Sequence, residues 1–168
     1  VIVKRDGKIR RIKAKQAIIL AAGGFEQNQS MREQYLPAPT NKAWSAGIKT
    51  NTGDAIVAGQ TIGAQIAQMD GAWWCSTVTV PGREYPFLSI VTKSMPGTFV
   101  VNQTGKRYGN ESQNYMSWSM GLFDQHNENN NCVPSYMIFD TKFKNKYSAF
   151  PLTGPDWLLP KACLLYTS

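Results

Sequence analysis

The alternation of apolar and polar residues predicts strands and helices along most of the chain. Residues 1–12 alternate on both sides of an Asp6-Gly7 pair, which is typical of a β-hairpin with a tight turn. Residues 14–22 become a continuous apolar run that ends at Gly23 and Gly24. Such a run is typical of a strand buried on both faces of a parallel sheet, where ligands bind at the carboxyl end.

The remaining pattern favours an α/β fold in two parts. The predicted helices cover residues 25–36, 51–62 and 112–122, and the further predicted strands cover residues 63–67, 98–102 and 135–139. Asn28 or Ser30 is expected to open the first of these helices, and Pro37 to end it. The composition becomes richer in aromatic and polar residues near residue 75, so we place a domain boundary there. Another helix is expected to begin at residues 153–157.

Composition and charge restrict the classes of function. The net charge of the 168 residues is +7, and seven Lys and Arg against one Asp lie within the first fifteen. This basic stretch could bind nucleic acid, but we favour the solvated face of a hairpin. No apolar run is long enough to span a membrane, so we expect a cytoplasmic protein without an integral membrane segment. Cys75, Cys132 and the lone His126 lack metal-ligand spacing, so no metal site is predicted.

The strongest signal for chemistry lies in residues 100–115, which read V-V-N-Q-T-G-K-R-Y-G-N-E-S-Q-N-Y. This segment resembles the active-site pattern V-N-x-x-G-x-R-F-x-N-E of the flavin-dependent fumarate reductase and 3-ketosteroid dehydrogenase superfamily. In that family the residue four past the Glu carries proton transfer, as Arg in fumarate reductases and as Tyr in 3-ketosteroid Δ1-dehydrogenases. The resemblance therefore implies that Tyr115 is the catalytic residue.

A tyrosine needs help to act as a base, because its unperturbed pKa is about 10. Hydrogen bonds or positive charge must stabilise the phenolate. The resemblance implies a second tyrosine for this task, located before Val1. Without the resemblance, Tyr115 would more often be a packed helix residue.

Two further motifs are similar to the flavin-binding segments of the same superfamily. Residues 21–28 resemble A-T-G-G-F-x-x-N, and residues 52–54 match T-G-D. Backbone close to a glycine turn and the free N–H groups of a helix N-terminus both suit an electron-rich cofactor. The resemblance thus implies FAD as the cofactor, and its expected contacts are Ala21, Ala22, Gly23, Thr52, Gly53 and Asp54. Alternatively, Thr52 or Asp54 is an ordinary helix cap and the glycines form a tight turn.

Other residues bear on the substrate. Residues 70–74 are similar to the D-x-A-W-W run of 3-ketosteroid dehydrogenases, and residues 91–97 lack the acid and Arg that serve fumarate reductases as a proton relay. Together with Tyr115, these two features favour 1,2-desaturation of a small apolar, steroid-like ketone. Such a reaction also requires an electron acceptor, which the sequence does not identify. Two alternatives remain: a reductase of an unsaturated carboxylate and a non-enzymatic basic binding module. The aromatic residues expected to line a substrate cavity or pack in a core are Trp73, Trp74, Tyr85 and Phe87.

The resemblance also implies a domain organisation. Residues 1–75 would be the later part of an FAD-binding domain built on a parallel sheet, and residues 76–162 the first part of an α+β substrate domain. Residues 163–168 can be encoded by TGT CTC TTA TAC ACA TCT, the end of a transposase adapter of sequencing libraries. We therefore expect a fragment whose last six residues are adapter-derived, a view with which the absence of an initiator Met agrees.

Overall fold

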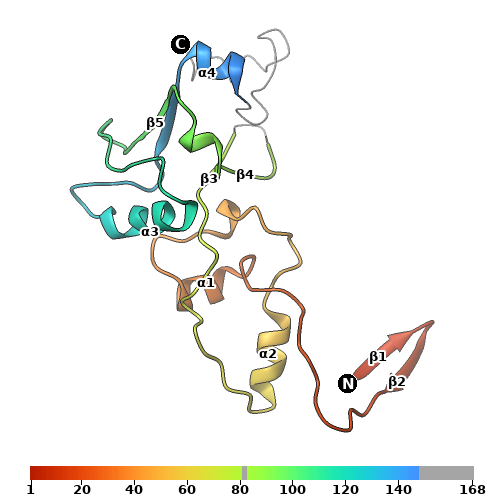
Figure 1. Cartoon of the computed structure of the whole chain (residues 1–168). Helices are drawn as coiled ribbons and strands as arrows, with labels where there is room; N and C mark the ends of the chain where they lie inside the picture. Colours follow the sequence, from red (N-terminus) through yellow and green to blue (C-terminus); the bar gives the residue numbers. More distant parts are fainter. Residues whose placement is uncertain (81–82, 148–168) are drawn as a thin grey trace.

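The computed structural model describes residues 1–80 and 83–147, and it combines short helices with three antiparallel strand pairs (Figure 1). The pairs are β1 (Ile2–Arg5) with β2 (Lys8–Arg11), β3 (Thr77–Val78) with β4 (Phe87–Leu88), and β5 (Thr98–Val101) with β6 (Tyr136–Phe139). The helices are α1 (Gln29–Tyr35), α2 (Asp54–Thr61), α3 (Tyr115–Gln125) and α4 (Thr141–Lys146), with 3₁₀ turns η1 (Lys42–Trp44) and η2 (Thr92–Ser94). The predicted mixture of helix and strand is confirmed.

The predicted N-terminal hairpin is present. Asp6 and Gly7 both adopt positive φ angles, 49° and 73°, as the tightest two-residue hairpin turns require. β1 and β2 pair from Ile2 with Arg11 to Arg5 with Lys8. In Figure 1 the hairpin stands away from the rest of the chain, and its basic side chains are exposed.

The strands predicted at residues 14–22 and 63–67 are wrong for this structure, since neither segment forms a strand. Residues 14–22 are exposed throughout, and Ile19 keeps 91% of its surface accessible. A strand needs neighbours that accept its backbone hydrogen bonds, and an apolar run alone does not provide them. Within residues 1–80 and 83–147 every strand pair is antiparallel, so the expected parallel sheet is not formed there.

The first two helices form within the predicted ranges 25–36 and 51–62. The side chain of Asn28 accepts a hydrogen bond from the Met31 backbone N–H at 3.2 Å and opens α1, which ends before Pro37. α2 begins at Asp54, and Gly53 is its N-cap residue with a φ of 84°. Neither Thr52 nor Asp54 is therefore the cap.

The second half of the chain packs around the β5–β6 pair. η2 contacts β5, and α4 follows β6 directly, with the Asp140 side chain accepting from the Phe143 backbone N–H at 2.7 Å. Phe143 is 1% exposed, and its ring packs in a tilted arrangement against Phe139 and Tyr147, with centroids 5.2 and 5.6 Å apart. α3 begins three residues later than predicted because Asn114 caps it. β3, β4 and α4 were not predicted, and the helix expected at residues 153–157 lies outside the described residues.

Candidate active site

Tyr115 is the first residue of α3, and its hydroxyl is already engaged. The Asn114 side chain accepts from the Ser117 backbone N–H at 2.9 Å, which fixes the start of the helix. The indole N–H of Trp73 donates to the Tyr115 hydroxyl oxygen at 2.6 Å, and the two ring centroids lie 6.4 Å apart. From the sequence, Trp73 was expected either to line a substrate cavity or to pack in a core. No local pattern indicates a contact between residues 42 positions apart.

The loop before Tyr115 is organised by a buried amide. The Asn102 side chain is 1% exposed, and its oxygen accepts from the backbone N–H groups of Thr104 at 3.0 Å and Lys106 at 2.9 Å. Its amide N–H₂ donates to the Asn130 side-chain oxygen at 2.6 Å. Gly105 has a φ of 78°, so it makes the turn of this loop. These contacts explain why an Asn and a Gly stand three residues apart in this motif.

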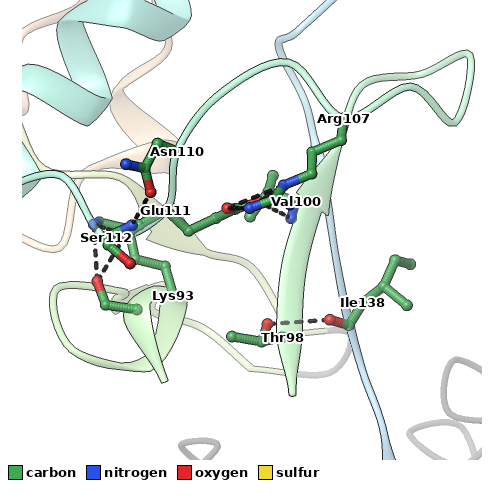
Figure 2. A network of polar contacts seen from close by, with 9 residues as sticks. Lys93, Thr98, Val100, Arg107, Asn110, Glu111, Ser112 and Ile138 are labelled. Atoms are coloured by element: carbon green, nitrogen blue, oxygen red, sulfur yellow. Dashed lines mark hydrogen bonds and ion pairs between the residues drawn. The ribbon is translucent and has the colours of Figure 1, made fainter. Parts of the chain in front are cut away.

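Glu111 joins the loop to strand β5 (Figure 2). Its carboxylate accepts from the Val100 backbone N–H at 2.8 Å and forms an ion pair with the Arg107 guanidinium at 2.5 Å. Burial alone would raise the pKa of Glu111, but the hydrogen bonds from Arg107 and from the Val100 N–H outweigh it and lower the pKa. The same pairing raises the pKa of Arg107. These contacts hold the loop against β5.

A buried lysine holds the same loop from the other side. Lys93, in η2, is 2% exposed, and its ammonium donates to the backbone oxygen of Glu111 at 2.6 Å (Figure 2). It also donates to the backbone oxygen of Gln113 at 2.6 Å. The ammonium also lies 5.5 Å from the ring centroid of Trp118. Burial lowers the pKa of Lys93, although Cys75 and Glu111 act in the opposite direction. Sequence reasoning missed this residue, because nothing in its flanking sequence marks it as buried.

The two predicted flavin motifs lie side by side. The Gly53 backbone N–H donates to the Gly24 backbone oxygen at 3.0 Å, and the Asn28 side chain donates to the Thr52 backbone oxygen at 3.0 Å. A Cβ on Gly53 would lie 2.5 Å from the Met31 sulfur, so this buried glycine is required by packing whether or not a cofactor is bound. The Thr52 hydroxyl donates to the Asp54 carboxylate at 2.8 Å.

The surroundings of these motifs fit a bound FAD. The N-cap residue of α2 is Gly53, which has no side chain to accept hydrogen bonds from the first N–H groups of the helix. These N–H groups are therefore available to an electron-rich partner. Ala21, Ala22 and Gly23 are exposed beside that helix end, since Gly24 is bonded to Gly53. Whether these residues contact a flavin stays a prediction.

A cavity of about 1150 Å³ connects the two halves of the chain. Tyr115 and Trp73 line it, and so does Gly24 from the first motif. Of the aromatic residues considered for such a cavity, Trp73 and Trp74 line it. Tyr85 instead lies under Lys49, whose ammonium nitrogen is 4.7 Å from the centroid of the Tyr85 ring. Other residues of the lining are Phe25, Arg32, Trp44, Cys75, Lys93, Tyr108, Trp118 and Cys132. The cavity is therefore largely aromatic and apolar, with a few polar groups.

Tyr108 lies in the same cavity but is a poor base. It stacks on Trp118 with ring centroids 5.8 Å apart, and its hydroxyl is 2.7 Å from that of Ser135. Burial, despite that hydrogen bond, raises the pKa of Tyr108 to about 12, so the phenol stays protonated at neutral pH. Burial also raises the pKa of the Cys75 and Cys132 thiols, which suits packed side chains better than nucleophiles.

The described residues contain neither a cluster of metal ligands nor a membrane-spanning helix. In the described ranges, His, Cys, Asp and Glu side chains form no cluster of three or more that could hold a metal ion. Over the same part of the chain, no helix has the length and apolar content needed to cross a bilayer.

Comparison with known proteins identifies the family. The family described as FAD binding domain matches residues 1–149, which is most of the chain. The chain therefore belongs to the FAD binding domain family, and FAD is its cofactor. The predicted resemblance is confirmed.

The relatives and a solved structure point within that family to dehydrogenases of ring ketones. The chain is 36% identical over 140 residues to a 3-oxosteroid 1-dehydrogenase of Mycobacterium tuberculosis, covering 81% of the chain and 24% of that protein. It is 32% identical over 164 residues to a 4-oxocyclohexanecarboxylate 2-dehydrogenase of Sinomonas cyclohexanicum, covering 92% and 28%. The structure of 3-ketosteroid Δ1-dehydrogenase from Sterolibacterium denitrificans with 1,4-androstadiene-3,17-dione matches with a TM-score of 0.83 at 42% identity, covering 95% and 28%. The chain thus spans about a quarter of the length of these proteins.

Proposed function

We propose that this chain is part of an FAD-dependent 3-ketosteroid Δ1-dehydrogenase, in which Tyr115 is the general base. The observation that carries the proposal is the place of Tyr115 in the large aromatic cavity that also reaches the flavin motif at Gly24. A general base must reach the substrate through a cavity that admits it, and this one is large enough for a steroid-sized ligand. The likeness to the steroid dehydrogenase of Sterolibacterium denitrificans supports the same assignment.

The reaction divides between the cofactor and the chain. When bound, FAD accepts a hydride from one ring carbon of the substrate. The oxygen of Tyr115 accepts the proton from the neighbouring carbon, which is acidic because it lies next to the carbonyl. Loss of the two hydrogens leaves a carbon–carbon double bond in the ring. An electron acceptor of unidentified class then has to take the two electrons from the reduced cofactor.

The cofactor would be held by the paired motifs. The backbone of Ala21, Ala22 and Gly23 would line one side, and Thr52 and Asp54 with the N-terminus of α2 the other. Gly53 would contribute by permitting the close packing of these segments. In the complete enzyme, residues 1–75 would belong to the FAD-binding domain and residues 76–162 to the substrate domain, and we propose a cytoplasmic location.

A second candidate substrate is a smaller cyclic ketone. The relative from Sinomonas cyclohexanicum, a 4-oxocyclohexanecarboxylate 2-dehydrogenase, matches 92% of the chain. The same base and the same cofactor would serve such a ring. A reductase of an unsaturated carboxylate is less compatible, because Tyr115 stands where the resemblance places an Arg in fumarate reductases.

The proposal is tested by Tyr115→Phe in the complete enzyme. The variant loses only a hydroxyl, so fold and bound flavin should persist while general-base assistance, typically about 10² to 10⁴-fold, is lost. Anaerobic stopped-flow bleaching of the flavin by a 3-ketosteroid, and separately by 4-oxocyclohexanecarboxylate, measures the step for each candidate. Tyr136→Phe is the matched control, since it removes another cavity hydroxyl from an exposed position. A reduction rate of Tyr115→Phe within a few-fold of Tyr136→Phe would remove Tyr115 from the mechanism.

A further inference from the structure

The contact between Trp73 and Tyr115 links two segments that meet at the cavity. The donor–acceptor distance of 2.6 Å is short for an N–H···O hydrogen bond. The ring planes are tilted by 36° with centroids 6.4 Å apart, so the two rings lie next to each other without stacking. Both residues line the cavity.

An indole ring gives this contact a fixed direction. Its N–H is a donor only, so Trp73 always presents a hydrogen to the Tyr115 oxygen and never removes one. The phenol must therefore direct its own O–H elsewhere. While the phenol oxygen carries negative charge, the same hydrogen bond is charge-assisted and stronger than the one to the neutral phenol.

The neighbouring tryptophan holds Trp73 in place. Trp74 packs edge to face on Phe123 of α3, with ring centroids 5.1 Å apart, and its backbone N–H donates to the Ala72 oxygen at 3.0 Å. The loop is thus anchored to the helix that carries Tyr115. Trp73 itself is 82% exposed and contributes little to the packing of the described residues. Its substitution should therefore leave the fold intact.

We propose that Trp73 is a positioning residue of the dehydrogenation, which orients the Tyr115 oxygen and stabilises its negative charge through the indole N–H. The proposal rests on the proposed function of Tyr115. It assigns separate tasks to the two adjacent tryptophans, since Trp74 anchors the loop and Trp73 presents the donor.

The test compares Trp73→Phe with Trp74→Phe in the complete, flavin-loaded enzyme. Trp73→Phe keeps an aromatic ring but loses the donor, so the limiting rate of anaerobic flavin reduction should fall by roughly tenfold to hundredfold, the usual effect of a hydrogen bond to a charged group. The substrate dissociation constant from the same stopped-flow titration should change by less than about twofold, because the donor acts on Tyr115 and not on the substrate. Flavin content and circular dichroism check that each variant is folded.

A double-mutant cycle separates positioning from packing. In the Tyr115→Phe background, adding Trp73→Phe should change the residual reduction rate by less than about twofold, because the oxygen on which Trp73 acts is gone. A full additive loss there, or a loss in Trp73→Phe confined to substrate affinity, would overturn the proposal. So would a Trp73→Phe limiting rate equal to that of the wild type. If Tyr115→Phe alone reduced flavin at the wild-type rate, the proposed function itself would fail, and this outcome is distinct from all of these.

Discussion

Glu111 is a buried carboxylate on which the loop before Tyr115 depends. It is 4% exposed, pairs with Arg107 and accepts from the backbone of β5. Glu111→Gln should lower the free energy of unfolding at pH 7 by about 1 to 3 kcal/mol, because hydrogen bonds to a charged group are exchanged for neutral ones. Urea unfolding followed by tryptophan fluorescence measures the change. Glu33→Gln, at an exposed carboxylate in α1, is the control and should shift stability by less than about 0.5 kcal/mol.

The contribution of Glu111 to the free energy of unfolding should depend on pH. The pKa of Glu111 is lower in the folded protein than in the unfolded chain, where a Glu titrates at about 4.3. Its stabilisation is therefore complete above that pH and disappears as the pH falls through the lower folded-state value. The difference between wild type and Glu111→Gln should narrow in that acidic window. A difference that stays constant through that window would contradict the ionised pairing.

At the residue scale, the sequence reveals local roles better than distant ones. Asn102, Gly105 and Glu111 act within ten residues of one another, so their motif predicts the loop. The hydrogen bond from Trp73 to Tyr115 crosses 42 positions. Neither it nor the burial of Lys93 follows from local spacing, because both depend on how separate segments meet.

At the scale of elements, α2 packs against α1 at its N-cap residue Gly53, where a side chain would collide with Met31 of α1. Gly53 combines a φ of 84° with a place for a Cβ 2.5 Å from the Met31 sulfur. Gly63, just after α2, has a φ of 86° and open space around it. Gly53→Ala should therefore lower the free energy of unfolding by about 1 to 3 kcal/mol more than Gly63→Ala, which has the backbone strain without the collision. Equal effects in urea unfolding would show that strain alone sets the requirement.

Helices α1, α2 and α3 were predictable, whereas the strands predicted at residues 14–22 and 63–67 do not form, and both outcomes have one physical reason. Helix limits are set by nearby residues, such as Asn28 before α1 and Pro37 after it. A strand is stable only with partners, and residues 14–22 have the apolar content of a buried strand while pairing with nothing in the described chain. β5 and β6 do form strands, because each provides the backbone hydrogen-bond partner of the other.

At the scale of the whole molecule, the apolar run within residues 14–22 is exposed in the described chain. Six consecutive apolar residues, 17–22, precede Gly23, and Ile19 among them is 91% exposed. The chain spans about a quarter of its relatives, so we propose that strands from the remainder of the FAD-binding domain cover this run. An apolar segment next to the flavin motif would then become the buried strand that its composition indicates.

If residues 14–22 are a buried strand in the complete enzyme, Ile19→Lys should destabilise that enzyme but not the 168-residue chain. In the 168-residue chain, Ile19→Lys should change the free energy of unfolding by less than about 0.5 kcal/mol, because the side chain stays in water. In the complete enzyme it would place a charge in a sheet interior, which costs several kcal/mol, so folded, flavin-bound protein should be largely lost. Urea unfolding of the chain and flavin content of the purified enzyme are the two measurements. A complete enzyme that tolerates Ile19→Lys with full flavin content would mean that residues 14–22 are not a buried strand there either, and the parallel sheet proposed beside the cofactor would have to be built from other segments.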